Sequence, residues 1–278
     1  MPELPEVQTV VDSLNQHRLA GRTITGAQVH WPKTVSPMVP TDFCRTIRGC
    51  RIERVSRRGK YIVMDLSHNL TLLIHLRMTG RLNWADRNDV RNPHEHVVLE
   101  VNSHHDLRFQ DTRKFGRMVL TTTPETILDT IGPEPLAATF TGKRLARMLG
   151  TRKRQIKPLL LDQAFVAGLG NIYVDEALWR AKIHPLRQSD SLSVKEITSL
   201  HRAIRQVLTK GLNNRGTSLG GGKGNFHAPG SGPGRNADQL KVFRRTGRAC
   251  PRCRTTIQRI IVGQRSSHVC LCCQALDG

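Results

Sequence analysis

Four cysteines near the C-terminus constrain the fold of this chain more than any other feature. Cys250 and Cys253 form one C-x2-C pair, and after sixteen residues Cys270 and Cys273 form a second. This spacing is typical of a ribbon that binds zinc, and four thiolates fill the tetrahedral coordination of the ion. The sequence therefore predicts one structural zinc on these four residues, with Cys272 as the alternative to Cys273.

A metal explains these cysteines better than disulfides do. The start of the chain has no basic region followed by an apolar core, so we expect no secretory signal and a cytoplasmic protein. Structural disulfides are rare in that compartment. A unit of about 30 residues builds too small a core to fold alone, and a bound metal replaces part of that core. We expect residues 239–278 to form such a unit, in which the hairpin between the pairs presents Arg265 to a phosphate or a base. The alternative for this hairpin is a solvated basic tip.

The charge of the chain indicates its partner. Forty-three Lys and Arg residues face 22 Asp and Glu residues, a formal net charge of +21. The basic residues occur along the whole chain, for example in 57–60 and 152–154, which favours a folded surface that binds DNA or RNA. The alternative is a basic surface without a specific ligand. Since no apolar run approaches the ~20 residues that span a bilayer, we expect no membrane partner.

The hydrophobic pattern changes near residue 125. Before it, short β-type runs such as 70–74, 96–101 and 117–120 follow a predicted helix from Glu6 to His17. These runs predict a β-sandwich or barrel behind an N-terminal helix. After it, helical patterning predicts four helices, which are Thr141–Leu149, Lys157–Val166, Asp175–Ala181 and Ser193–Leu212. Ser193 and Glu196 stand at the spacing of a capping box.

Two glycine-containing segments indicate contacts with a ligand. Gly168 and Gly170 precede Asn171, and they permit a tight turn in which backbone N–H groups approach a phosphate at a helix N-terminus. Residues 216–238 are rich in glycine. We interpret this second segment as a flap that orders over a bound base, and the alternative is a plain interdomain linker.

The N-terminal run Met1-Pro2-Glu3-Leu4-Pro5-Glu6-Val7 resembles the start of the formamidopyrimidine-DNA glycosylase and endonuclease VIII family. The resemblance covers essentially the whole chain, and several separate motifs occur in the family's order. They lie at residues 57–61, 75–80, 111–116, 156–158 and 168–173 and in the four-cysteine ribbon. The resemblance implies an α+β fold with a β-sandwich catalytic domain at 1–124, a helix-two-turn-helix domain with a lesion loop at 125–238, and a zinc ribbon at 239–278.

The resemblance also implies a catalytic mechanism. Met1 is removed, and the free secondary amine of Pro2 attacks the deoxyribose C1′ to form a cationic Schiff base. This cation is an electron sink that permits β- and then δ-elimination of the flanking phosphates. Glu3 resembles the acid/base that protonates the ring oxygen, and Glu6 resembles a carboxylate that positions the amine. Lys60 resembles the lysine that holds a phosphate beside the lesion.

A base inside the DNA stack must be flipped out before it can react, and side chains must fill the gap. Met78, Arg113 and Phe115 match the family's void-filling trio, because Met and Phe wedge into the stack while Arg bonds to the orphaned base. Core packing is the alternative for Met78 and Phe115. The remaining DNA contacts implied by the resemblance are phosphate clamps at Asn171 and Arg265, a further lysine at Lys157, and a histidine near the backbone at His94, for which a solvated loop position is the alternative.

The chain departs from the family pattern at a few positions. Thr112 stands where proline is usual, and Lys114 stands where arginine is common. The run at 220–226 differs from the commonest lesion-recognition loop, which bears on the preferred base and leaves the chemistry unaffected.

We therefore predict a bifunctional DNA glycosylase and AP lyase of base-excision repair, which acts on 8-oxoguanine and formamidopyrimidines in damaged double-stranded DNA. We expect a monomer that associates with the nucleoid through DNA. One alternative is an endonuclease VIII-type preference for oxidised pyrimidines, against which Leu4 and Met78 argue. A second alternative is a non-catalytic zinc-ribbon DNA-binding protein, which gives no reason for Pro2, Glu3 and Lys60 to occur together.

Overall fold

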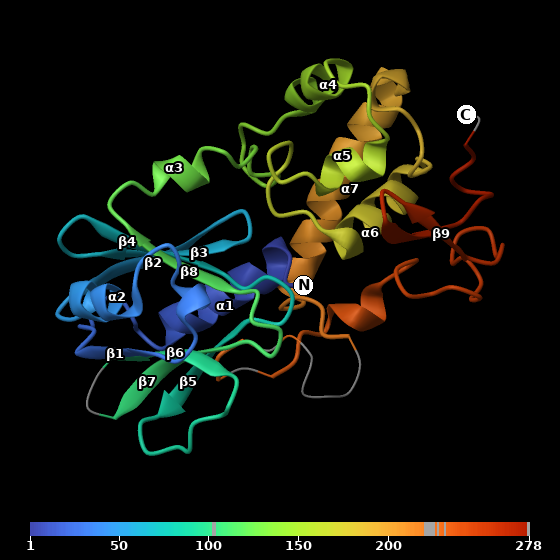
Figure 1. Cartoon of the computed structure of the whole chain (residues 1–278). Coiled ribbons are helices and arrows are strands. Elements are labelled where there is room, and N and C mark those ends of the chain that lie inside the picture. The colour runs from blue at the N-terminus through green and yellow to red at the C-terminus, as the bar shows by residue number, and fades with distance from the viewer. Residues whose placement is uncertain (102–103, 220–225, 227, 231, 277–278) are drawn as a thin grey trace. The chain divides into compact units, whose positions relative to one another are not determined.

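The structure is a computed structural model that describes residues 1–101, 104–219, 226, 228–230 and 232–276. Contacts divide the chain into two compact units (Figure 1). Unit 1 consists of Met1–Asp129 and Asn214–Arg235, and unit 2 consists of Thr130–Asn213 and Asn236–Gly278. The predicted three-part division followed chain order and stays a prediction. By contacts, the glycine-rich segment belongs with the N-terminal residues, and the ribbon belongs with the helices.

Helix α1 (Leu4–Gln16) opens unit 1. Its apolar residues Val7, Val10, Val11 and Leu14 are all buried, which confirms the face predicted from their spacing. The helix begins two residues earlier than predicted because Glu3 is its N-cap and the Glu6 carboxylate accepts the Glu3 N–H at 2.8 Å.

Two four-stranded antiparallel sheets form the rest of unit 1, in the orders β2-β3-β4-β8 and β1-β6-β7-β5. The predicted α+β class with a β-sandwich is thereby confirmed. Side chains that alternate along the strands, such as Ile62, Ile74 and Leu107, fill the core. The strands are β1 (Gly26–Val29), β2 (Ile52–Arg58), β3 (Tyr61–Leu66), β4 (Leu70–His75), β5 (Arg81–Asp86), β6 (Glu95–Glu100), β7 (His105–Gln110) and β8 (Arg117–Thr121), with short helices η1 (Pro32–Thr34), α2 (Pro40–Ile47) and α3 (Glu125–Leu128).

Unit 2 is helical and carries the ribbon. Its helices are α4 (Gly142–Gly150), α5 (Ile156–Leu161), α6 (Asn171–Ala181) and α7 (Val194–Asn213), with 3-10 turns η2 (Ser189–Ser191) and η3 (Asn236–Gln239), and its hairpin is β9 (Gln258–Val262) and β10 (Arg265–Val269). The predicted capping box at the start of α7 is confirmed, since the Ser193 N–H donates to Glu196 Oε2 at 2.7 Å. Helix α5 ends five residues earlier than predicted, because Asp162 leaves the helical conformation and its side chain accepts the Ala164 N–H at 3.1 Å.

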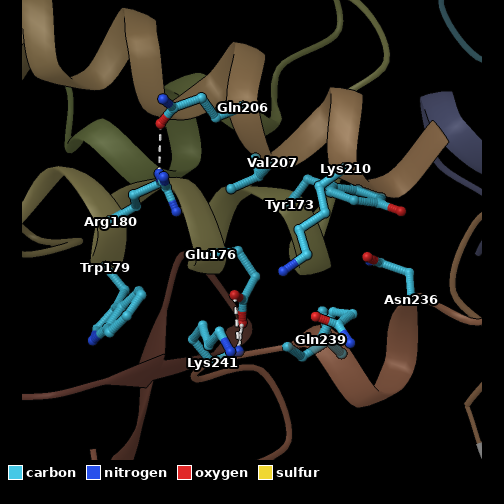
Figure 2. Close-up of a pocket in the computed structure, with 11 residues that line it drawn as sticks. Tyr173, Glu176, Trp179, Arg180, Gln206, Val207, Lys210, Asn236, Gln239 and Lys241 are labelled. Carbon is cyan, nitrogen blue, oxygen red and sulfur yellow. Dashed lines mark hydrogen bonds between the residues drawn. The ribbon is translucent and has the colours of Figure 1, made fainter. Parts of the chain in front are cut away.

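A buried carboxylate fastens the chain before the ribbon to α6. Glu176 Oε1 accepts the backbone N–H groups of Lys241, Val242 and Phe243 at 2.8–3.0 Å. Figure 2 shows Glu176 pointing from α6 toward Lys241. The start of the ribbon is therefore tied to unit 2 through three backbone donors that would otherwise be buried without acceptors. Among the described residues, no helix combines the length and the apolar character needed to cross a bilayer.

Candidate functional site

Two carboxylates are buried at the start of unit 1. Glu3 is 2% exposed and Glu6 is 1% exposed, and Pro2 beside them is also buried. Glu6 Oε2 accepts the Glu3 N–H at 2.8 Å, and Glu6 Oε1 accepts the Thr217 N–H at 2.7 Å. Fully buried carboxylates are rare in proteins, so two of them beside each other at the start of a helix mark a candidate reaction site. This arrangement also places all three predicted residues together.

The base of the glycine-rich segment is held by the same carboxylate. Gly216 has φ +78°, and a Cβ there would lie 3.0 Å from Glu6 Cγ, so only glycine fits without strain. Beyond it, the Ser218 hydroxyl accepts the Gly234 N–H at 2.8 Å and donates to the Phe226 carbonyl at 2.6 Å. The two ends of the segment are thus joined next to Glu6. The predicted flap over a bound base is the segment 216–238, and its residues 220–225, 227 and 231 lie outside the described residues.

Lys60 lies in the two-residue turn between β2 and β3, where Arg58 pairs with Tyr61. Its neighbour Gly59 has φ +55°, as the first position of a tight hairpin turn of this kind requires. The guanidinium of Arg57 donates to the Gly59 carbonyl at 2.9 Å and to Gln8 Oε1 at 3.0 Å, which ties the turn to α1. Lys60 is only 4% exposed. Its low exposure is compatible with its predicted place at a reaction site.

His75 is a neighbour of Lys60 for which the sequence predicted no role, although it opens the motif at 75–80. It pairs with Tyr61 across β3 and β4, and the two ring centroids lie 4.8 Å apart. Burial, followed by the charges of Arg77 and Lys60, lowers the pKa of His75 to about 3. The ring is therefore neutral, and its Nδ1 accepts the Arg77 N–H at 3.0 Å. A histidine that stays neutral beside two cations adds a polar group to this region without adding repulsion.

The three predicted void-filling residues lie on two loops of unit 1. Met78 is 38% exposed and Phe115 is 48% exposed. The guanidinium carbon of Arg113 lies 4.7 Å from the centroid of the Phe115 ring, so these two side chains stack. Core packing, the alternative for Met78 and Phe115, is therefore wrong. Exposed apolar side chains of this size on adjacent loops are typical of a binding surface.

Asp111 organises both loops, and the sequence predicted no role for it beyond its motif. Its side chain is fully buried and accepts the Thr79 hydroxyl, the Arg113 N–H at 3.2 Å and the Gly116 N–H at 2.7 Å. A Cβ at Gly116 would lie 2.2 Å from Phe109 Cζ, so the chain approaches the core too closely for any other residue. The loop that carries Met78 and the loop that carries Arg113 are thus held by one carboxylate.

His94 lies in the loop before β6 and is exposed. Its carbonyl accepts the Asp111 N–H at 2.9 Å, which places it next to the loop of Arg113. The exposed ring is compatible with both readings of the sequence, so the predicted DNA contact of His94 stays a prediction.

In unit 2, Asn171 contacts Ser266, the residue that follows Arg265. Asn171 is the first residue of α6, and its Nδ2 donates to the Ser266 carbonyl at 2.9 Å. Arg265 itself is exposed at the start of β10. Gly168, with φ +81°, makes the tight turn that was predicted before this helix. An amide side chain at a helix N-terminus and an exposed guanidinium beside it form an arrangement suited to a phosphate.

Lys157 does not occupy the position that its predicted DNA contact requires. Its side chain is fully buried, and its Nζ lies 2.5 Å from Asp175 Oδ1 and 2.9 Å from the Ser266 carbonyl. The ammonium therefore contacts protein acceptors in the interior of unit 2. A buried lysine is stable only with such a partner, which explains its placement.

The four predicted zinc ligands converge. The sulfur atoms of Cys250, Cys253, Cys270 and Cys273 all lie within 4.8 Å of one another. Tetrahedral zinc with Zn–S bonds of ~2.3 Å requires S···S separations of roughly 3.8 Å. The sulfur pairs Cys250–Cys273 and Cys253–Cys270 are 4.0 and 3.3 Å apart, so the group fits this ion. Cys272 is exposed and lies outside the group, which decides the open question in favour of Cys273.

Three family models match the chain. The model of the formamidopyrimidine-DNA glycosylase N-terminal domain matches residues 1–118, the model of the H2TH domain of the same enzyme matches 131–221, and the model of a zinc finger found in FPG and IleRS matches 247–276.

Curated relatives and solved structures agree with these matches. The formamidopyrimidine-DNA glycosylase of Protochlamydia amoebophila is 45% identical over 274 residues, which are 99% of each chain. That of Chloroflexus aurantiacus is 45% identical and covers 99% of this chain and 98% of its own. A mutant Lactococcus lactis FPG bound to DNA containing Fapy-dG is 35% identical, with a TM-score of 0.91 and coverage of 99% and 100%. The L. lactis Fpg complex with DNA containing an abasic site has 36% identity, a TM-score of 0.90 and coverage of 98% and 99%.

Proposed function

The chain belongs to the formamidopyrimidine-DNA glycosylase family, and from this premise we propose that Pro2 is its nucleophile. The protein is a base-excision repair enzyme that removes oxidised purines from damaged DNA and has the AP lyase activity of its family. The observation that carries the assignment of the site is the burial of Glu3 and Glu6 beside Pro2.

The first step proposed for this site is attack on the sugar. Once Met1 has been removed, the lone pair of the Pro2 secondary amine forms a bond to C1′ of the flipped nucleotide, and the bond from C1′ to the damaged base breaks. The base leaves with the bonding electron pair and takes up a proton, and the attacking nitrogen loses the proton it carried. Glu3 donates a proton to the ring oxygen as the ring opens, and the amine nitrogen and C1′ become a cationic Schiff base. Glu6 holds the backbone at Glu3 and Thr217, and so keeps the start of α1 in place for the attack.

The lyase steps follow from the electron demand of the Schiff base. Loss of a proton from C2′ sends an electron pair toward the cation and expels the 3′ phosphate, and a second elimination expels the 5′ phosphate. Lys60 is proposed to hold a phosphate beside the lesion. Its support is the buried turn that Arg57 fixes and the neutral His75 beside it.

We propose two groups of DNA contacts, one on each unit. On unit 1, Met78, Arg113 and Phe115 fill the space that the flipped nucleotide leaves, which their exposure and stacking support. On unit 2, Asn171 and Arg265 bind a phosphate of the backbone. The net charge of +21 supports a large electrostatic share of the affinity and association with the nucleoid through DNA. We also propose that the enzyme acts as a monomer, since one chain carries every residue assigned here.

The role of Glu3 predicts a difference between two substrates. Glu3→Gln should slow release of the base from an intact damaged nucleotide by about a hundredfold, because general acid catalysis contributes roughly that much. Strand cleavage at a preformed abasic site should fall much less, because that sugar is already partly ring-opened. Single-turnover rates on the two substrates test this. An equal loss on both would show that Glu3 is not the acid of ring opening.

The role of Asp111 predicts a defect in base flipping. Asp111→Ala leaves the buried Gly116 N–H without its acceptor, at a cost of about 1–3 kcal/mol, and it also removes the bonds of that carboxylate to the Thr79 hydroxyl and the Arg113 N–H. We expect stability to fall by about this amount and excision from duplex DNA to slow at least tenfold, while cleavage of a single-stranded abasic site changes little. Urea unfolding and single-turnover rates measure both. If duplex excision stays at the wild-type rate, the two loops do not depend on Asp111.

A further inference from the structure

A buried ion pair joins three elements of unit 2. Lys157 of α5 and Asp175 of α6 are both fully buried, and Lys157 Nζ lies 2.5 Å from Asp175 Oδ1. The other oxygen of Asp175 accepts the His268 N–H and contacts His268 Nδ1, both at 2.9 Å. Both carboxylate oxygens of Asp175 are therefore used, one toward α5 and one toward β10.

The same network reaches the proposed phosphate clamp through one carbonyl group. The Ser266 carbonyl accepts from Lys157 Nζ at 2.9 Å and from Asn171 Nδ2 at 2.9 Å. Ser266 follows Arg265 directly in β10. Besides the pairing of β10 with β9, the backbone next to Arg265 is therefore held by the two bonds to Ser266 and by the bond that Asp175 makes to the His268 N–H.

We propose that the Lys157–Asp175 pair positions the phosphate clamp of Asn171 and Arg265, and that neither member of the pair touches DNA. This inference rests on the function proposed above for Asn171 and Arg265. It assigns Lys157 and Asp175 as positioning residues and explains why this lysine of unit 2 is buried.

The physical reason is that a buried charge pair with all its acceptors used has one stable geometry. If either charge is removed, the other is left unpaired in the interior and the surrounding chain must shift to reach water. The parts that can shift are the ones the pair holds, namely the hairpin at Ser266 and the side chain of Asn171. A shift of about 1 Å is enough to break hydrogen bonds to a phosphate, whose preferred lengths vary by only a few tenths of an ångström.

The experiment measures binding of the full-length zinc-loaded protein to duplex DNA with a tetrahydrofuran abasic analogue, over a range of salt concentrations. The variants are Asp175→Asn, Lys157→Met, Arg265→Ala and the double variant Asp175→Asn/Arg265→Ala. Lys157→Met serves if Asp175→Asn does not fold, because it keeps the bonds between Asp175 and His268. Leu145→Ala is the control, since it removes a fully buried side chain of α4 and lowers stability without touching the network.

We expect Asp175→Asn and Lys157→Met to weaken binding about tenfold and to lower the salt slope by about one unit, as the loss of one phosphate contact does. The double variant should weaken binding by less than the sum of the two single effects, because Arg265→Ala has already removed one of the contacts that the pair positions. Asp175→Asn and Lys157→Met should keep the zinc content and the cleavage rate at saturating DNA of the wild type, and Leu145→Ala should bind normally.

Two different failures can be told apart. If Arg265→Ala binds like wild type, the clamp itself is wrong, and the proposed function of Arg265 fails with it. If Arg265→Ala is weak but Asp175→Asn and Lys157→Met bind normally, or if the effects in the double variant add, the clamp exists and the positioning role is overturned. Weak binding by Leu145→Ala equal to that of Asp175→Asn would also overturn it, since loss of stability alone would then explain the effect.

Discussion

Replacing Pro2 with glycine, or retaining Met1, is expected to abolish base excision while DNA binding persists. Retained Met1 converts the Pro2 nitrogen into an amide, which has no lone pair available for attack on C1′. Glycine keeps a free amine, but a primary one without the ring that fixes its direction. We expect the excision rate to fall by about a thousandfold or more, which corresponds to about 4 kcal/mol of activation free energy. Binding should change little, because affinity comes mainly from phosphate contacts.

Borohydride trapping measures this outcome directly. Reduction of the Schiff base should cross-link the wild-type protein to damaged DNA, and mass spectrometry of the same sample reports whether Met1 is present. Glu3→Gln is the matched comparison, since it keeps the amine and should still cross-link to a preformed abasic site. If protein that retains Met1 cross-links as well as processed protein, Pro2 is not the nucleophile.

The second large effect concerns the zinc ribbon. Cys253→Ser should lose the metal and unfold the hairpin, because zinc supplies most of the folding free energy of such units, about 10–16 kcal/mol in zinc-finger peptides. DNA binding should then weaken at least tenfold. Four thiolates leave no open position on the ion, so zinc takes no part in the chemistry, and cleavage at saturating DNA should be retained.

The chain provides a matched control for this variant. Cys272 is exposed and outside the sulfur group, so Cys272→Ser should keep one zinc per chain and bind DNA normally. Metal content and salt-dependent affinity are measured on both variants. Full affinity in a zinc-free Cys253→Ser protein would contradict a role of the ribbon at the DNA.

Much of the candidate site was predictable from the sequence because its signals are local. The ligand spacing of the ribbon follows from the geometry of a C-x2-C turn, and the structure brings those four sulfurs together. The α1 helix followed from its apolar spacing, and Pro2, Glu3 and Glu6 are neighbours in the chain. Motif order likewise identified the family, whose models match the N-terminal, H2TH and zinc-finger regions.

The sequence was insufficient to predict which of the candidate side chains are buried. Lys157 was predicted to contact DNA because it is basic and lies in a family motif, yet it is fully buried. Asp111 was part of a quoted motif, and nothing in its spacing indicated that it would hold two loops at once. For Met78 and Phe115 the sequence could not exclude burial, because apolar side chains are typical of a core. Both are exposed in the structure.

The sequence by itself determined the chemistry that this protein carries: an N-terminal proline followed by two carboxylates, four zinc ligands and an excess of positive charge. Only the tertiary structure decided which polar groups stabilise the candidate site through hydrogen bonds and ion pairs. Asp175 meets Lys157 across 18 residues, Ser266 meets Lys157 across 109, and Thr217 meets Glu6 across 211. The physical reason is that a buried charge needs partners that stabilise it, and local spacing carries no information about those partners that are distant in the sequence.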